Sequence, residues 1–236
     1  MPARPRYGQR GSRRPAGRIA DVSQSGWAVV VPVKRLTAAK SRLRGALPGV
    51  PHEELALALA ADTLRAVLAC PTVAEVLVVT DDARVAAAAR AAGARVLPDE
   101  PDAGLNAAFR HGAAGVPAGW VGGLTADLPA LRPAELAGAL LAAQTGRAGV
   151  RRFVPDAPGG GTVLLTAPPG IPLDPRFGVG SAAAHAASGA LPLTGDWPSL
   201  RRDVDTAADL AAAARLGLGP HTAALLAAGC PARSAG

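Results

Sequence analysis

Aromatic residues are scarce in this chain of 236 residues, since Phe, Trp and Tyr together make up only 3% of it. Hydrophobic residues still make up 49%, so we expect an ample core built from Ala, Val and Leu. The scarcity counts against proteins that bind single-stranded nucleic acids by stacking bases on aromatic side chains. The length suits one α/β domain better than two small ones.

Cysteines and membrane-spanning runs are also lacking. Cys70 and Cys230 are far apart and do not have the spacing of a metal site, so we expect two free thiols in a reducing cytoplasm. No apolar run reaches the roughly 18 residues of a membrane span without a charge, Gly or Pro. The sequence therefore predicts a cytoplasmic protein with no membrane partner.

The net charge of +7 is concentrated at the N-terminus. Residues 1–26 contain six arginines against Asp21 and carry +5, which leaves +2 for the other 210 residues. We interpret residues 1–26 as a disordered Arg-rich tail and residues 27–236 as one nearly neutral domain. A nucleic-acid-binding protein that uses this tail is the non-enzyme alternative, and its affinity should fall steeply with salt. We expect no specific nucleic-acid partner.

The apolar pattern predicts alternating strands and helices. Strands are expected at residues 27–33, 75–80, 94–97, 119–124, 150–154 and 162–165. Helices are expected at residues 52–69, from a cap at Asp81 or Asp82 to residue 92, and at 105–114, 133–143, 181–188, 206–216 and 221–228. This alternation is typical of an α/β fold with a mostly parallel, Rossmann-like sheet and helices on both faces. Ligands of such sheets bind beyond the carboxyl ends of the strands, so the residues that follow each strand are the candidate functional residues.

Basic residues follow the first predicted strand directly. Lys34, Arg35, Lys40 and Arg42 lie within nine residues of one another. Cationic donors at the mouth of a parallel sheet suit phosphate groups, although a solvated basic loop would have the same composition. The segment lacks the G-x-x-x-x-G-K-[ST] pattern, so it is not a P-loop.

Carboxylates follow another predicted strand. Asp127 comes just after the strand at 119–124 and is followed by Leu-Pro. Mg²⁺ prefers one or two carboxylates together with phosphate oxygens, and Asp127 is well placed to supply one. Asp203 and Asp205 project to the same side of an extended segment, and they would complete a metal site if the fold brings them to Asp127. Alternatively, Asp127 caps a turn and Asp205 caps the next helix.

Glycines, hydroxyl groups and an amide form a third group of candidates. Gly178 and its neighbours allow the backbone to approach an anion closely, and Ser181 offers a hydroxyl group at a helix start. The bland alternative is an ordinary glycine-containing loop. We interpret His185, one turn later, as a structural or rim residue rather than a base. Asn106 either binds a base or ribose or caps its helix.

These segments occur together in one order: Val33-Lys34-Arg35-Leu36, Gly104-Leu105-Asn106, Asp127-Leu128-Pro129, Gly161-Thr162, Phe177-Gly178-Val179-Gly180-Ser181 and Asp203-Val204-Asp205. In this the chain resembles, over about residues 27–218, the CofC/FbiD family of guanylyltransferases of coenzyme F420 biosynthesis. One departure is Ala126, because the family usually has Gly before the aspartate.

The resemblance implies a single-domain, MobA-like nucleotidyltransferase fold that uses GTP and Mg²⁺. It implies a phosphorylated acid as acceptor, with phosphoenolpyruvate favoured over 2-phospho-L-lactate and 3-phosphoglycerate. Thr162, Gly178 and Ser181 would hold the acid, and Asp127 would bind metal with Asp203 or Asp205. Lys34 and Lys40 would hold the β- and γ-phosphates, with Arg35 and Asn106 as further nucleotide-binding candidates.

The enzyme alternative is a MobA-like or sugar-1-phosphate nucleotidyltransferase with another acceptor. Those families usually have a Gly-rich loop after the first strand, whereas this chain has Val33-Lys34-Arg35-Leu36 there. The sequence leaves both a monomer and a homodimer open.

Overall fold

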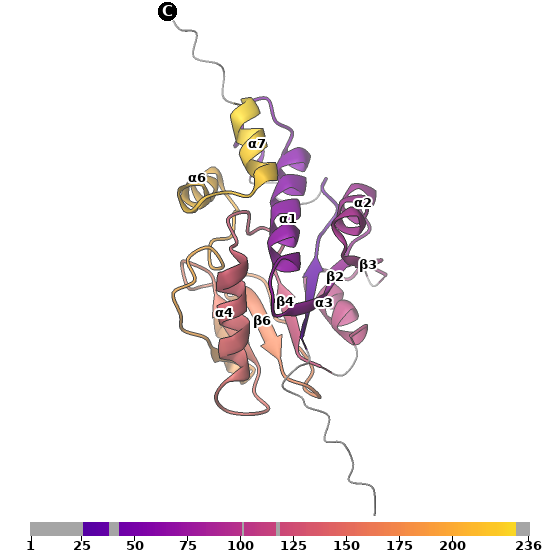
Figure 1. Cartoon of the computed structure of the whole chain (residues 1–236), viewed down its shortest axis with the longest axis vertical. Coiled ribbons are helices and arrows are strands. Elements are labelled where there is room, and N and C mark those ends of the chain that lie inside the picture. The colour runs from indigo at the N-terminus through magenta and orange to yellow at the C-terminus, as the bar shows by residue number, and fades with distance from the viewer. Residues whose placement is uncertain (1–25, 38–42, 101, 117–118, 230–236) are drawn as a thin grey trace, which may run out of the picture.

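The computed structural model describes residues 26–37, 43–100, 102–116 and 119–229, and it confirms the predicted alternation of strands and helices (Figure 1). The strands are β1 (Trp27–Pro32), β2 (Val73–Val79), β3 (Arg95–Leu97), β4 (Val121–Leu124), β5 (Arg152–Pro155), β6 (Thr162–Ala167) and β7 (Leu191–Pro192). The helices are α1 (His52–Leu68), α2 (Ala83–Ala92), α3 (Leu105–Ala114), α4 (Pro133–Gln144), α5 (Ser181–Ala187), α6 (Ala207–Leu216) and α7 (Pro220–Gly229). The tail at residues 1–25 and Cys230 lie outside the described residues, and Cys70 is a buried free thiol.

The strands form one sheet in the order β3-β2-β1-β4-β6-β5-β7. β1 pairs in parallel with β2 and β4, and β2 pairs in parallel with β3. β6 runs antiparallel to both of its neighbours, β4 and β5. Its first residue, Thr162, therefore lies at the same edge of the sheet as the carboxyl ends of β1, β2 and β4. The mostly parallel sheet that the sequence predicts is confirmed, with β6 as the exception.

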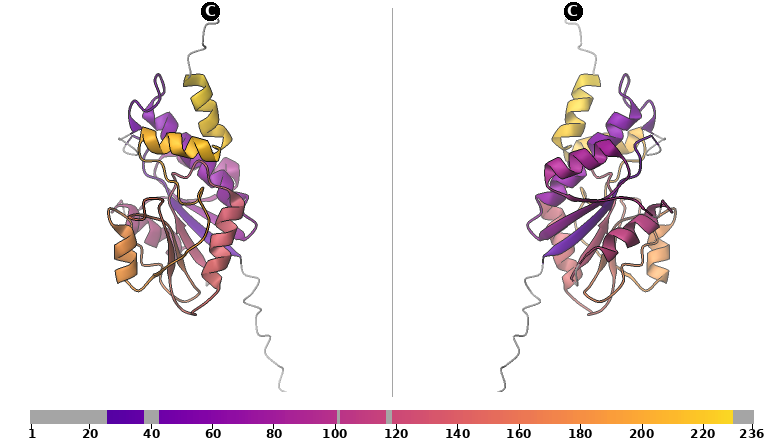
Figure 2. Two further views of the ribbon diagram at one scale, coloured as in Figure 1. Left: turned by 90° about the vertical axis from the view of Figure 1, so that its left-hand side faces the viewer. Right: turned by 90° about the vertical axis from the view of Figure 1, so that its right-hand side faces the viewer.

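Helices cover both faces of this sheet (Figure 2). In β1, Val29 and Val31 belong to the core under α1, α2 and α4, whereas Ala28 and Val30 belong to the core under α3 and the loop before α5. The alternation follows from the two-residue repeat of a strand, and it explains why a strand buried on both faces is apolar at every position.

The C-terminal helices lie beyond one end of the sheet, beside the first half of α1 (Figure 1). Leu210 and Ala213 of α6 are buried with Leu55 and Leu59 of α1, and Val204 joins the same cluster. This packing brings the segment before α6 to the carboxyl end of β4.

No helix in the described parts of the chain has both the length and the apolar character needed to cross a membrane.

Candidate active site

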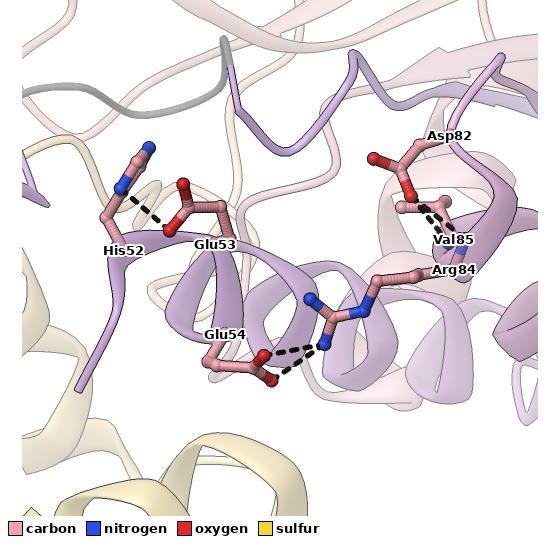
Figure 3. Close-up of polar contacts among 6 residues, drawn as sticks. All are labelled: His52, Glu53, Glu54, Asp82, Arg84 and Val85. Carbon is pink, nitrogen blue, oxygen red and sulfur yellow. Dashed lines mark hydrogen bonds and ion pairs between the residues drawn. The ribbon is translucent and has the colours of Figure 1, made fainter.

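The loop after β1 is anchored by a side chain that follows β2. The N–H of buried Leu36 donates to Asp82 Oδ2 at 2.9 Å. Asp82 is also the N-cap of α2 and accepts the N–H groups of Arg84 and Val85 (Figure 3). Burial alone would raise the pKa of Asp82, but these donors outweigh it and hold the pKa below its ordinary value. Asp82 therefore stabilises both the loop after β1 and the start of α2.

The same corner joins α1 to α2, because Arg84 contacts both carboxylate oxygens of Glu54 at 2.8 Å (Figure 3). This fixes the start of α2 against the first turn of α1. The loop after β1 is therefore bonded to the start of α2, which is in turn bonded to α1.

Two of the predicted phosphate-binding cations can be placed in this loop. Lys34 and Arg35 are both exposed at the carboxyl end of β1. Arg35 pairs with Asp81 at 3.5 Å, and Asp81 also accepts the N–H of Asp99. Burial and the negative charges of Asp81 and Asp102 raise the pKa of Asp99. Lys40 lies outside the described residues, so its predicted role stays a prediction.

Asp127 lies just beyond β4, and its two neighbours along the chain are tied to one hydroxyl group. Leu128 N–H donates to Oγ1 of Thr63 at 2.9 Å, and that oxygen lies 3.2 Å from the carbonyl oxygen of Ala126. Thr63 is completely buried in α1. Both peptide groups that flank Asp127 therefore contact the same helix.

The second acid-bearing segment lies directly against Asp127. The N–H of Val204 donates to the main-chain carbonyl oxygen of Asp127 at 3.0 Å. Val204 is buried, whereas Asp205 is exposed and Asp203 is partly exposed. Neighbouring residues of an extended chain point to opposite sides, so both aspartates project away from the core that Val204 enters. The convergence of the two segments, on which the predicted metal site depends, is present.

Asp205 is not the cap of α6. Thr206 is the N-cap, and it forms a capping box with Asp209, whose carboxylate accepts the Thr206 N–H at 2.9 Å. This removes the helix-cap alternative for Asp205. The described residues contain no group of three or more His, Cys, Asp or Glu side chains able to hold a metal ion.

The acid-binding candidates come together around β6 and α5. Ser181 is buried, and its N–H donates to the carbonyl oxygen of Gly178 at 3.1 Å. Gly178 has a φ of 137°, which favours glycine. Thr162 begins β6, and its hydroxyl oxygen lies 2.9 Å from Nδ1 of His185, one turn after Ser181. Thr162 and Ser181 are thus connected through α5.

Asn106 has a structural contact that the sequence did not predict. Its side-chain nitrogen donates to the carbonyl oxygen of Phe177 at 2.9 Å, and its oxygen accepts the Phe177 N–H at 2.7 Å. The amide pairs with the main chain as a neighbouring strand would. This holds the loop that carries Gly178, while contact with a base or ribose stays a prediction.

Sequence reasoning missed one buried polar residue that supports the site, Thr63, whereas it interpreted His185 as a structural or rim residue, and the structure agrees with the structural role. His185 is completely buried, and its Nε2 accepts the N–H of Arg176 at 2.9 Å. Burial, with a further contribution from the positive charge of Arg151, lowers the pKa of His185 to about 4. A polar residue among the apolar positions of α1 was the one available signal for Thr63, and its partners follow only from the packing of α1.

The family model described as "Guanylyl transferase CofC like" matches residues 27–188. A phosphoenolpyruvate guanylyltransferase of Salinispora arenicola is 74% identical over 205 residues, which cover 87% of this chain and 95% of that protein. One of Geodermatophilus obscurus is 56% identical over 210 residues and covers 87% and 96%.

A solved structure shares the fold. The nucleotidyl transferase of Methanothermobacter thermautotroptrophicus superposes with a TM-score of 0.58 at 18% sequence identity, over 81% of this chain and 98% of that one. The predicted nucleotidyltransferase fold is thereby confirmed.

Proposed function

The chain belongs to the family of CofC-like guanylyl transferases, and we propose that it transfers GMP from GTP to the phosphate group of phosphoenolpyruvate. The observation that carries the proposal is the hydrogen bond from Val204 to the carbonyl oxygen of Asp127. It brings two acid-bearing segments together at the sheet edge where ligands of this fold class bind. Relatives that are 74% and 56% identical are named for this activity.

The reaction is an in-line displacement at phosphorus. A phosphate oxygen of the acid attacks the α-phosphorus of GTP and forms the new P–O bond. The bond between the α-phosphorus and the oxygen that bridges to the β-phosphate breaks, and pyrophosphate leaves with that electron pair. The acid's phosphate is already an anion near neutral pH, so no general base is required. The difficulty is to bring two anions together, and positioning and electrostatics supply the catalysis.

The basic loop after β1 is suited to the triphosphate. Lys34 is exposed there and would hold the β- and γ-phosphates or the leaving pyrophosphate. Arg35 is less available, because Asp81 already accepts from it at 3.5 Å. Lys40 is proposed for the same role from its place in the motif. Asn106 is proposed to contact the nucleotide through the amide N–H and oxygen lone pair that Phe177 does not use.

The carboxylates fit a magnesium ion. Mg²⁺ is usually held by one or two carboxylates plus substrate phosphates and waters. Asp127, together with Asp203 or Asp205, offers such a set, since Val204, which lies between these two aspartates, donates its N–H to the carbonyl oxygen of Asp127 at 3.0 Å. When bound, Mg²⁺ would offset the negative charge of the phosphate groups. The protein's own contribution is to fix Asp127 through Thr63 and Val204.

The acid would bind between β6 and α5. Thr162 and Ser181 offer hydroxyl groups there, and Gly178 leaves room for an anion to approach the main chain. Small oxygen-rich acids need such donors rather than an apolar pocket. We place the reaction in coenzyme F420 biosynthesis because the family resemblance implies it.

The experiment supplies GTP and Mg²⁺ together with one acceptor at a time. The acceptors are phosphoenolpyruvate, 2-phospho-L-lactate, 3-phosphoglycerate and glucose-1-phosphate, and phosphorus NMR identifies the products. We expect pyrophosphate and a GMP-linked acid in equal amounts with phosphoenolpyruvate. Turnover of glucose-1-phosphate alone would favour the sugar-1-phosphate alternative.

A shortened chain tests the nucleic-acid alternative. An enzyme should keep its turnover without residues 1–26, whereas a nucleic-acid-binding protein that uses the tail should lose its affinity.

A further inference from the structure

His185 is enclosed at the back of the proposed acid site. It is completely buried, and its ring lies 5.8 Å from that of Phe153 and 5.2 Å from that of Phe177, which meets it edge-on at 77°. Both ring nitrogens have polar contacts, and the imidazole also has a hydrogen bond with the main chain of Ser181. Nδ1 lies 2.9 Å from Oγ1 of Thr162, and Nε2 lies 2.9 Å from the main-chain nitrogen of Arg176.

The second contact fixes where the ring proton sits. A main-chain N–H can only donate, so Nε2 of His185 accepts from Arg176 and carries no proton. A neutral imidazole then has its proton on Nδ1. The burial that lowers the pKa of His185 to about 4 keeps the ring neutral at physiological pH.

The tautomer in turn orients Thr162. Nδ1–H donates to the Thr162 hydroxyl oxygen at 2.9 Å, so the hydroxyl's own proton points to a different partner. Among the described residues, no other hydrogen bond to this hydroxyl is present. Thr162 lies at the sheet edge shared with Asp127 and belongs to the proposed acid site. Thr162 is itself buried, at 6% exposure, so its hydroxyl proton would turn to an acid bound against this edge.

We propose that His185 is a positioning residue that turns the Thr162 hydroxyl into an obligate hydrogen-bond donor to the acceptor acid. The ligand atom at this position must then be a hydrogen-bond acceptor, such as a carboxylate or phosphate oxygen. His185 also accepts the main-chain N–H of Arg176, next to Phe177 and Gly178. The inference rests on the proposed function.

Two amide substitutions separate the two contacts. In His185→Asn the amide nitrogen takes nearly the place of Nδ1 and can still donate to Thr162, but Arg176 loses its acceptor. In His185→Gln the amide oxygen takes nearly the place of Nε2 and can still accept from Arg176, but Thr162 loses its donor. Each variant breaks one hydrogen bond, and the pair is matched in polarity. His221→Gln, on an exposed residue, is the control for histidine loss.

Steady-state kinetics with GTP and phosphoenolpyruvate provide the first readout. We expect His185→Gln to raise KM for the acid about ten-fold or more, because the Thr162 hydroxyl is no longer held with its proton toward the charged acid. His185→Asn should stay within about three-fold of the wild type, a difference below 1 kcal/mol. KM for GTP should be unchanged in both. If the two variants raise KM for the acid equally, or if His185→Asn raises it more than His185→Gln, the positioning role is wrong.

A double variant tests whether His185 acts through Thr162. In a Thr162→Val background, His185→Gln should cause no further rise in KM for the acid, because the hydroxyl group is already gone. Additive effects would contradict the inference.

Nitrogen-15 NMR of histidine-labelled wild-type protein provides a readout without substrate. The chain has four histidines, and the signals lost in His185→Asn identify this ring. We expect a neutral ring with the proton on Nδ1 at pH 7, and a proton on Nε2 would overturn the inference even if a variant fails to fold. If the tautomer is as expected but the wild type uses none of the acids, both the proposed function and the inference fail. If the wild type is active but its ring has the other tautomer, the inference alone is overturned.

Discussion

The main-chain N–H of Val204 donates to the carbonyl oxygen of Asp127 at 3.0 Å. This one contact joins the end of β4 to the segment before α6, and it brings three aspartates to one edge of the sheet. Val204 is completely buried, so the contact is anchored by the packing of α1 and α6. The convergence of charge therefore depends on the hydrophobic core.

Asp203→Asn and Asp205→Asn should identify the second magnesium ligand. Both side chains project away from Val204, and Mg²⁺ is usually held by one or two carboxylates, so we expect one of the two variants to be affected more. That variant should need at least about ten-fold more Mg²⁺ for half-maximal turnover. Asp209→Asn is the matched control, because it weakens the cap of α6 without touching the metal. An unchanged Mg²⁺ requirement in both variants contradicts the assignment.

Thr63→Val should slow turnover while Thr63→Ser does not. Valine has nearly the shape of threonine, but it leaves the buried N–H of Leu128 without its acceptor, at a cost of about 1–3 kcal/mol. Asp127 then loses a tether, and we expect kcat to fall about ten-fold. Serine keeps the oxygen. Thermal melts verify that both variants are folded, and equal kcat values in both would show that the tether does not matter for turnover.

Lys34→Met should weaken GTP binding more than Arg35→Met. Loss of a hydrogen bond to a charged phosphate corresponds to about 1.5–3 kcal/mol, or roughly a ten-fold or larger rise in KM for GTP. Arg35 already shares its charge with Asp81 at 3.5 Å, so we expect its removal to change KM by less than about three-fold. KM for the acid serves as the internal control. If Arg35→Met raised KM for GTP more than Lys34→Met, Arg35 rather than Lys34 would be the residue that binds the phosphates.

The stability of the protein should fall on mild acidification because of His185. The unfolded chain binds a proton at this residue below about pH 6.5, whereas the folded protein does so only below about pH 4. Unfolding between these values takes up a proton, so the free energy of unfolding decreases as the pH falls, by up to roughly 3 kcal/mol. The charged groups that face the ring are Arg151, Asp174 and Arg176.

Denaturant titrations of the wild type and His185→Asn, at pH 7 and at pH 4.5, measure this contribution. Asparagine does not titrate, so the variant should lose less stability than the wild type between the two pH values. Identical losses would show that His185 is not the group responsible. Asp174, whose pKa is lowered mainly by its hydrogen bond from Arg151, is present in both proteins and cancels in the comparison.

The fold was largely predictable because its signals are local. β1 is apolar at every position, and α2 begins at the N-cap Asp82 and ends at Gly93, with a φ of 98°. The antiparallel direction of β6 and the two-residue strand β7 leave no such trace. Strand direction depends on where a loop returns, and two residues are too few to show a period.

The site was predictable as a set of residue types at strand ends, but its internal contacts were not. Asp127 follows β4 as expected, whereas the support it receives from Thr63 depends on the rotation of α1 against the sheet. Asn106 illustrates the same limit, because a polar side chain at a helix start can serve a ligand or the neighbouring main chain. Here it pairs with Phe177.

The most direct test of the account is Asp127→Asn, which removes a charge without changing shape. Pyrophosphate release with GTP, Mg²⁺ and phosphoenolpyruvate should fall at least about a hundred-fold, and Mn²⁺ binding followed by electron paramagnetic resonance should weaken. The melting temperature should hardly change, because the main-chain carbonyl of residue 127 still accepts from Val204. Near-normal pyrophosphate release and Mn²⁺ affinity in this variant would contradict a metal-assisted GMP transfer centred on Asp127.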